Sequence, residues 1–391
     1  MINLVFCSFE VGGFPFKIAE ILNNHGIKTY YVAISNDAGH DSSAFHYDAI
    51  DFEWNLSGEY KGCDRKLVVK QLENLKKEKK INCCFATGSS AYLLSEAGIE
   101  YYYWSYGSDL DLECFYPFNG ATIYHQLVYL KYIVKKIQER INARKSIVKA
   151  KSIMISPYQI AALDKVYPTA KRFFLPHYFE SKYPNFDALF KAKLNAKKEL
   201  CEKYGVKSFL FSSTRHYWYG NKAKMSDNKG NDVIVETFAE YVSLLGNRNV
   251  ALIFVAKGPD VSKTTELISK YGLSKNVYWV DEMKRSDLER YYLGSEYCFG
   301  QFGTNVLTNS VLEPLLFGGI SISSDNSQPG GHYYSELPPI INANNPKKIA
   351  SLMMYMDQFD EYKRELMRKS YQWIINNCSY MSFVNAYSSL L

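Results

Sequence analysis

Short apolar runs alternate with longer amphipathic stretches along most of this 391-residue chain. In the first half, the runs INLVFCSF (residues 2–9), IKTYYVAI (27–34) and INCCFATG (81–88) have the composition of buried strands. The stretch KLVVKQLENLKKEKK (66–80) has its apolar residues at helical spacing. Apolar strands separated by helices are typical of a parallel sheet with helices on both faces, so the alternation predicts an α/β fold.

The same alternation restarts in the second half of the chain. Strand-like runs recur as SFLFSSTR (208–215), VALIFVAKGPD (250–260), NVYWVDEM (276–283) and EYCFGQFG (296–303). Because the chain is too long for one ordinary core, we expect two Rossmann-like domains facing each other across a cleft. We place them at residues 1–185 and 186–370, followed by a helical C-terminal tail at 371–391 that closes the chain.

The composition argues against several classes of function. The net charge of +6 is modest and no zinc-finger or RNA-binding motif is present, so we expect no nucleic-acid partner. The eight cysteines form no CxxC pair, which indicates buried thiols in a reducing compartment. The first residues lack a signal-peptide pattern and no apolar run reaches 18 residues, so we expect a cytoplasmic protein.

The stretch from Gly258 to Gly303 and the following segment, FGTNVLTNSVLEPLLFGG (302–319), combine a Gly-Pro loop, a Tyr-Tyr helix, a strand and a late acid, Glu313. This order resembles the donor domain of GT-B glycosyltransferases of the retaining family-four (group 1) kind, and the resemblance covers about residues 208–344. It implies a hexosyl- or related transferase that moves sugar from a UDP- or GDP-linked donor to a hydroxyl of a glycan or lipid-linked glycan. It also implies retention of configuration without a metal or other cofactor.

The resemblance implies that Glu313 accepts hydrogen bonds from the ribose hydroxyls of the donor, a role that suits a carboxylate. The small and polar residues before it are expected to let the backbone approach the ligand: Gly303, Thr304 and Asn305. Asn305 stands where the family has a second Glu, whereas Gln301-Phe302 fits a variant with Gln-Phe before a Gly-rich run. By itself, Glu313 could equally be an acid that stabilises the start of its helix.

Two cations in SSTRHYWYGNKAKMSDNKGNDVIVETF (212–238) match the Arg and the Lys-Gly of the family pattern. The resemblance implies that Arg215 and Lys229 contact the donor diphosphate and stabilise the charge that develops on the leaving group. Their separation is longer than usual, so Lys222 or Lys224 competes for this role, and both cations could also be surface residues. Glu282 and Met283, at the end of a predicted strand, complete the donor-binding set.

The first half of the chain supplies the expected acceptor side. The loop VGGFPF (11–16) contains Gly12 and Gly13, whose spacing does not fit a dinucleotide fingerprint. WSYGSDLDLE (104–113) resembles the family's His-Gly-Ser-Asp loop, with Tyr106 in place of His, and Asp109 is expected to line the acceptor site. Asp109 and Asp111 also form a DxD pair, which would bind a metal ion in a different class of glycosyltransferase.

The basic stretch LVYLKYIVKKIQERINARKSIVKAK (127–151) alternates apolar and cationic residues. It fits either a peripheral contact with the anionic inner face of a membrane or an ordinary solvated helix face. Two other functional interpretations also stay open, namely a catalytically silent GT-B protein that binds nucleotide-sugars and a GT-B epimerase.

Overall fold

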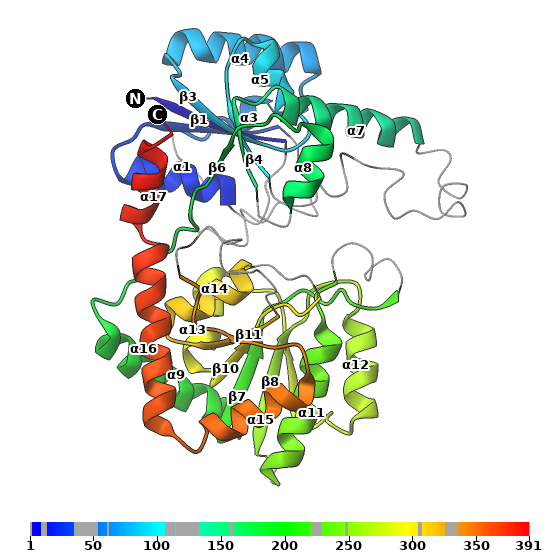
Figure 1. Ribbon diagram of the computed structural model, residues 1–391, viewed down its shortest axis with the longest axis vertical. Coiled ribbons are helices and arrows are strands. Elements are labelled where there is room, and N and C mark those ends of the chain that lie inside the picture. The colour runs from blue at the N-terminus through cyan, green and yellow to red at the C-terminus, as the bar shows by residue number, and fades with distance from the viewer. Residues whose placement is uncertain are drawn as a thin grey trace. The chain divides into compact units, whose positions relative to one another are not determined.

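The computed structural model describes residues 2–8, 14–34, 54–60, 62–105, 114, 133–155, 159–220, 228–246, 249–303, 307–324, 334 and 336–390. The chain divides into two compact units, Met1–Phe174 and Leu175–Leu391. Each unit contains a parallel six-stranded sheet flanked by helices, which confirms the predicted α/β architecture with two Rossmann-like domains (Figure 1).

The sheet of the first unit has the strand order β2-β1-β3-β4-β5-β6. Its strands are β1 (Asn3–Cys7), β2 (Thr29–Ala33), β3 (Cys83–Thr87), β4 (Tyr102–Trp104), β5 (Ser152–Met154) and β6 (Arg172–Phe173). The helices are α1 (Phe14–Asn24), α3 (Ser57–Tyr60), α4 (Arg65–Lys79), α5 (Tyr92–Glu96), α7 (Ile133–Val148) and α8 (Ile160–Val166). All residues of β1, β2 and β3 are buried, which explains why their sequences are apolar without alternation.

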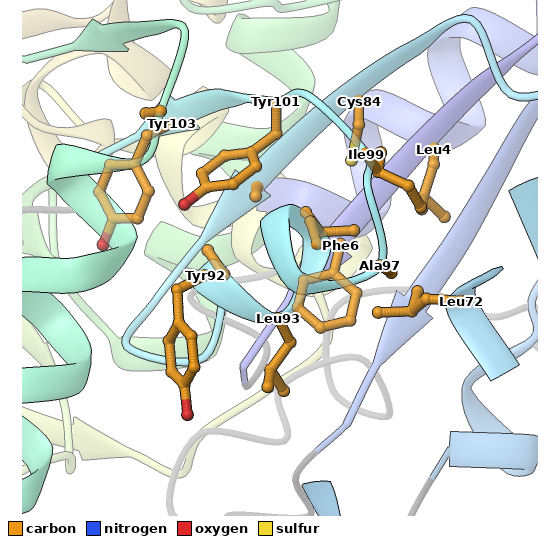
Figure 2. Packing of buried hydrophobic residues seen from close by; sticks show 14 of the residues in the cluster. Leu4, Phe6, Leu72, Cys84, Tyr92, Leu93, Ala97, Ile99, Tyr101 and Tyr103 are labelled. Carbon is orange, nitrogen blue, oxygen red and sulfur yellow. The ribbon is translucent and has the colours of Figure 1, made fainter. Parts of the chain in front are cut away.

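The core of the first unit forms where helices cover this sheet. Side chains from β1, α4 and α5 converge there, and Figure 2 shows Phe6, Leu72 and Leu93 among them. Tyr101 joins the cluster, and its hydroxyl donates to the Ser146 carbonyl oxygen of α7 at 2.7 Å. This bond satisfies the polar end of a large buried side chain, as burial requires.

The sheet of the second unit has the order β12-β11-β10-β7-β8-β9. Its strands are β7 (Ser208–Ser212), β8 (Val250–Val255), β9 (Val277–Val280), β10 (Tyr297–Phe299), β11 (Ile320–Ser323) and β12 (Ile341–Asn342). The helices are α9 (Phe186–Tyr204), α11 (Asn231–Leu245), α12 (Val261–Lys270), α13 (Arg285–Gly294), α14 (Asn309–Leu316), α15 (Pro346–Met356), α16 (Asp360–Asn377) and α17 (Tyr380–Ser388). The chain order reverses between β7 and β10, and such a reversal is where open α/β sheets bind ligands at the carboxyl ends of their strands.

The structure divides the chain after Phe174, whereas the sequence analysis placed the boundary at 185/186. The sequence marks residue 185 because Asn185 caps α9, accepting a hydrogen bond from the Ala188 amide at 2.9 Å. Residues before this cap nevertheless belong to the second unit, since the Phe179 amide donates to the Cys378 carbonyl oxygen at 2.8 Å. Residue 371, where the predicted helical tail begins, lies inside α16, which runs from Asp360 to Asn377.

A polar network ties the last helices of the second unit to its sheet. The Asp357 carboxylate accepts hydrogen bonds from the hydroxyls of Tyr241 and Tyr297 and pairs with Lys363 at 2.7 Å. Tyr297 is the first residue of β10, so the network lies at the amino edge of the sheet. Within the described ranges, no helix combines the length and apolar character needed to cross a membrane.

Candidate functional site

The loop after β7 is hydrogen-bonded to the end of β10, and these two strands flank the reversal point of the second sheet. The Ser212 hydroxyl donates to the Phe299 carbonyl oxygen and the Thr214 hydroxyl donates to that of Gly300, both at 3.2 Å. Both side chains are buried. The two loops that leave the carboxyl ends of these strands are therefore held at a fixed spacing.

Asn231, the first residue of α11, fixes the other side of the same loop. Its completely buried side chain accepts a hydrogen bond from the Tyr217 amide at 3.3 Å and donates to the Thr214 carbonyl oxygen at 3.5 Å. The Lys229 amide in turn donates to the Tyr217 carbonyl oxygen at 2.8 Å. These bonds place Lys229 beside the loop that carries Arg215.

The structure brings Lys229 to the end of β10. Its ammonium nitrogen lies 3.2 Å from Oε1 of Gln301, and its carbonyl oxygen accepts from the Phe302 amide at 3.1 Å. Gln301 is largely buried and its carbonyl oxygen accepts from the hydroxyl of Ser323 at 2.6 Å. The side-chain partner of Lys229 on Gln301 is a neutral amide oxygen, which accepts a hydrogen bond from the ammonium group.

Two glycines allow residues 228–230 to pack directly on residues 302–303. Gly230 has a φ of +66°, and a Cβ there would lie 2.6 Å from the Cβ of Phe302. A Cβ on Gly303 would lie 2.3 Å from the Asn228 carbonyl oxygen. Sequence analysis expected Gly303 to admit a ligand, and the described geometry gives this glycine a role in contact between two chain segments.

Arg215 extends from the loop after β7, with its guanidinium carbon 5.5 Å from the centre of the Tyr217 ring. The loop packs closely on Gly258, where a Cβ would lie 2.7 Å from Cγ of Arg215. The next residue, His216, is completely buried, and its Nδ1 lies 2.9 Å from the Thr264 hydroxyl. Burial lowers the pKa of His216 to about 4, so this histidine is neutral and anchors the loop.

Glu313 is the fifth residue of α14, so it lies one turn inside the helix rather than at its start, which the N-cap Thr308 defines. The Tyr292 hydroxyl donates to Oε2 of Glu313 at 3.2 Å. The Ser213 hydroxyl, directly after β7, lies 2.7 Å from the same Tyr292 hydroxyl. Glu313 is thus connected through Tyr292 to the loop that carries Arg215.

Glu282 and Met283 follow β9, which is separated from β7 by β8. The Glu282 carboxylate pairs with the Lys257 ammonium at 2.7 Å, and both side chains are exposed. These two predicted residues are therefore placed on the far side of β8 from Lys229.

Six predicted residues lie outside the described ranges: Gly12, Gly13, Tyr106, Asp109, Thr304 and Asn305. The competing cations Lys222 and Lys224 and the acid Asp111 lie outside them as well.

Sequence analysis missed three residues of this site: Ser213, Tyr292 and Asn231. Ser213 and Asn231 have weak signals, since small polar residues directly after a strand or at the start of a helix commonly bond nearby backbone groups. Tyr292 has no local signal, because its hydroxyl contacts residues that lie 79 and 21 positions away in the chain. No group of three or more His, Cys, Asp or Glu side chains suited to a metal ion occurs among the described residues.

Solved structures with this fold span the whole chain. Sucrose-phosphate synthase from Thermosynechococcus elongatus superposes with a TM-score of 0.66 at 11% identity, covering 100% of this chain and 98% of that one. HepE from Anabaena, in complex with UDP and glucose, has a TM-score of 0.62 at 11% identity. The match covers 100% of this chain and 99% of HepE. A glycosyltransferase from Rickettsia africae has a TM-score of 0.62 at 14% identity, and the match covers 100% of this chain and 97% of that one. The predicted GT-B fold is thereby confirmed, while no protein-family model and no curated protein sequence matches the chain.

Proposed function

We propose that this protein is a glycosyltransferase that moves a sugar from a nucleoside-diphosphate sugar to a hydroxyl acceptor. The observation that supports the proposal is that Lys229 contacts Gln301 after β10, Arg215 follows β7, and Glu313 is linked through Tyr292 to Ser213 in the same β7 loop. Cations and a carboxylate at such a point match two parts of a nucleoside diphosphate, its phosphates and its ribose hydroxyls. HepE, which has a similar fold, was solved with UDP-glucose.

In this proposal, Lys229 and Arg215 bind the diphosphate. As the glycosidic bond breaks, negative charge grows on the leaving diphosphate, and fixed cations stabilise it without having to reorganise. The contact between Lys229 and Gln301 serves this role, because it orients the ammonium group. This chemistry requires no metal ion, and the donor is a UDP- or GDP-linked sugar.

Glu313 binds the ribose in this proposal. A carboxylate has two oxygens and can accept several hydrogen bonds at once, so it accommodates the Tyr292 hydroxyl together with vicinal ribose hydroxyls. Retention of configuration and an acceptor site that includes Gly12, Gly13, Tyr106 and Asp109 are part of the same proposal, on the strength of the family resemblance. Asn305 in place of an acid then alters how the transferred sugar is held.

The proposed acceptor is a glycan or a lipid-linked glycan, and a peripheral membrane contact through α7 accompanies it. Three exposed apolar residues lie on α7 at helical spacing, Ile137, Ile141 and Val148, and Lys145 is exposed between the last two. Apolar side chains mixed with lysines favour an anionic lipid surface. We expect Ile141→Ser to weaken sedimentation with phosphatidylglycerol vesicles, and Leu67→Ser, at an exposed position of α4, to leave it unchanged.

A thermal-shift screen with UDP, GDP and their sugar derivatives tests the donor site. We expect at least one nucleotide to raise the melting temperature of the parent protein, with little shift for Glu313→Gln or Lys229→Met. Glu266→Gln is the matched control, because it makes the same chemical change at an exposed ion pair with Lys263. Equal shifts for Glu313→Gln and Glu266→Gln would contradict the proposed site.

Turnover separates a transferase from a silent nucleotide-sugar-binding protein. We expect the nucleotide that stabilises the protein to be released from its sugar derivative when glycan or lipid-linked acceptors are supplied. Stabilisation without release across a broad acceptor panel would instead support the silent alternative. Release of free sugar at the same rate with and without acceptors would contradict transfer to a hydroxyl acceptor.

A further inference from the structure

A chain of hydroxyl groups links three elements of the second unit. Ser213 follows β7, Tyr292 lies on α13 and Glu313 lies on α14. The Ser213 and Tyr292 hydroxyls are 2.7 Å apart, and the Tyr292 hydroxyl is 3.2 Å from Oε2 of Glu313. Figure 1 shows α13 and α14 next to each other at the sheet to which β7 belongs.

The single proton of the Tyr292 hydroxyl determines the direction of this chain. A deprotonated Glu313 can only accept, so Tyr292 donates its proton to the carboxylate, and Ser213 must then donate to the Tyr292 oxygen. Burial raises the pKa of Tyr292 well above its usual value, and the nearby charge of Glu313 raises it further. The tyrosine therefore keeps its proton at neutral pH and donates it to the ionised carboxylate.

The ring of Tyr292 is held firmly by neighbouring aromatic rings. It stacks on Phe317 with centroids 6.0 Å apart and planes 11° apart, and it meets Phe211 of β7 edge to face at 5.3 Å. Only 2% of the residue is exposed. Because packing fixes the ring, the position of its hydroxyl is fixed before any ligand binds.

Packing alone does not require this arrangement. A phenylalanine would fill the same space, and a buried tyrosine hydroxyl is commonly satisfied by a backbone carbonyl, as that of Tyr101 is in the first unit. Here the hydroxyl bonds the carboxylate that we assign to the ribose. Its second partner, Ser213, is two residues from Arg215, which we assign to the diphosphate.

We propose that Tyr292 is a positioning residue that orients the Glu313 carboxylate for the ribose hydroxyls and couples it, through Ser213, to the loop that binds the diphosphate. This inference rests on the proposed function of the site. The terminal torsion of a glutamate is broad, so a carboxylate without a fixed donor samples many orientations. With one oxygen fixed by Tyr292, the plane of the Glu313 carboxylate is set before the nucleotide arrives, which reduces the ordering cost of binding.

Isothermal titration with the best-binding compound among UDP, GDP, ADP and CDP tests the inference. We expect Tyr292→Phe to weaken binding of the ribonucleotide by about tenfold while leaving binding of its 2′,3′-dideoxy analogue unchanged. Tyr291→Phe is the matched control, because Tyr291 also packs on Phe211 but its hydroxyl lies 3.1 Å from that of Tyr204 on α9. This control should keep the parent preference for the ribonucleotide.

The preference for ribonucleotide over dideoxy analogue separates positioning from general damage to the fold. A misfolded site would lose both ligands together, whereas a carboxylate that has lost the Tyr292 donor loses only the contribution of the ribose hydroxyls. Ser213→Ala should reduce the same preference by a smaller factor, since it removes the donor to Tyr292 but not the bond to Glu313. In the presence of Glu313→Gln, we expect Tyr292→Phe to have little additional effect.

Three outcomes decide the matter. A reduced preference in Tyr292→Phe with a parent-like preference in Tyr291→Phe supports the positioning role. An unchanged preference in Tyr292→Phe, with the parent binding the ribonucleotide, overturns the positioning role and leaves the proposed function intact. If no nucleoside diphosphate binds the parent protein, the proposed function fails, and the positioning role fails with it.

Discussion

The packing of residues 228–230 on residues 302–303 can be tested with a pair of glycines at the two ends of α11. Gly230 is the N-cap of this helix and Gly246 is its C-cap, with φ values of +66° and +63°. A Cβ on Gly230 would lie 2.6 Å from the Phe302 Cβ and 3.0 Å from the Gly303 amide nitrogen. A Cβ on Gly246 would meet no atom within 4 Å. The two positions therefore share backbone strain and differ in steric contact.

These contacts set the expected stability changes. A non-glycine residue in the left-handed region costs about 1–2 kcal/mol, which is the whole expected effect of Gly246→Ala. Gly230→Ala adds a forced displacement of packed chain, which costs about 1–3 kcal/mol more. We therefore expect Gly230→Ala to lower the free energy of unfolding of the second unit by about 2–5 kcal/mol, clearly more than Gly246→Ala.

Hydrogen exchange of α11 peptides across a urea series reports the unfolding of the second unit separately from the first. Gly230→Ala should lower the urea concentration at the unfolding midpoint more than Gly246→Ala does. The slope of the unfolding free energy against urea concentration should be the same in both variants. It should also weaken binding of the nucleotide found in the thermal-shift screen, because Lys229 precedes the displaced residue. Equal midpoints for the two variants would refute the close packing that brings Lys229 to Gln301.

Two further predictions concern an acidic network and two buried histidines of the second unit. Asp357→Asn should lower the stability of the second unit by about 2–3 kcal/mol, because Lys363 loses a charged partner in a partly buried network, while nucleotide affinity at low temperature stays unchanged. Burial lowers the pKa of His177 and His216 to about 4, so stability present above pH 6.5 should be lost as the pH falls toward 4, by up to about 3 kcal/mol for each histidine. Urea midpoints measured from pH 7.5 to 4.5 check this loss. If His177→Asn and His216→Asn leave the dependence of the urea midpoint on pH unchanged, the prediction is contradicted.

The sheet of the second unit could be predicted because its strands β7, β8, β10 and β11 are almost entirely buried. Every residue of β8, VALIFV, is buried, so its sequence is apolar throughout and stands out against the polar segments around it. The positions of Arg215 and Lys229 in the chain could also be predicted, since both residues lie next to the ends of predicted elements. The contact of Lys229 with Gln301 could not be predicted from spacing alone, because it depends on β10 lying beside β7 in the sheet.

Hydrogen bonds between distant segments explain most of what the sequence could not reveal. The contact of Tyr292 with Glu313 joins two helices, and nothing in the periodicity of α13 separates Tyr292 from its neighbour Tyr291. The domain boundary was displaced for a similar reason. Asn185 gives a clear local signal as a helix cap, whereas the bond from Phe179 to Cys378 that assigns the preceding residues to the second unit spans almost 200 positions.

The proposed donor site owes its geometry to residues that we do not expect to touch the ligand. Ser212 and Thr214 fix the β7 loop to β10, and Asn231 fixes the same loop to α11. Since these bonds join protein groups to one another, they hold the loop that carries Arg215 in place and reduce the ordering cost of binding a ligand there. It follows that affinity for the nucleotide should be sensitive to buried hydroxyl and amide groups behind the site. Such an effect depends on the order of the strands, because only the β7–β10 pairing puts Thr214 within reach of Gly300.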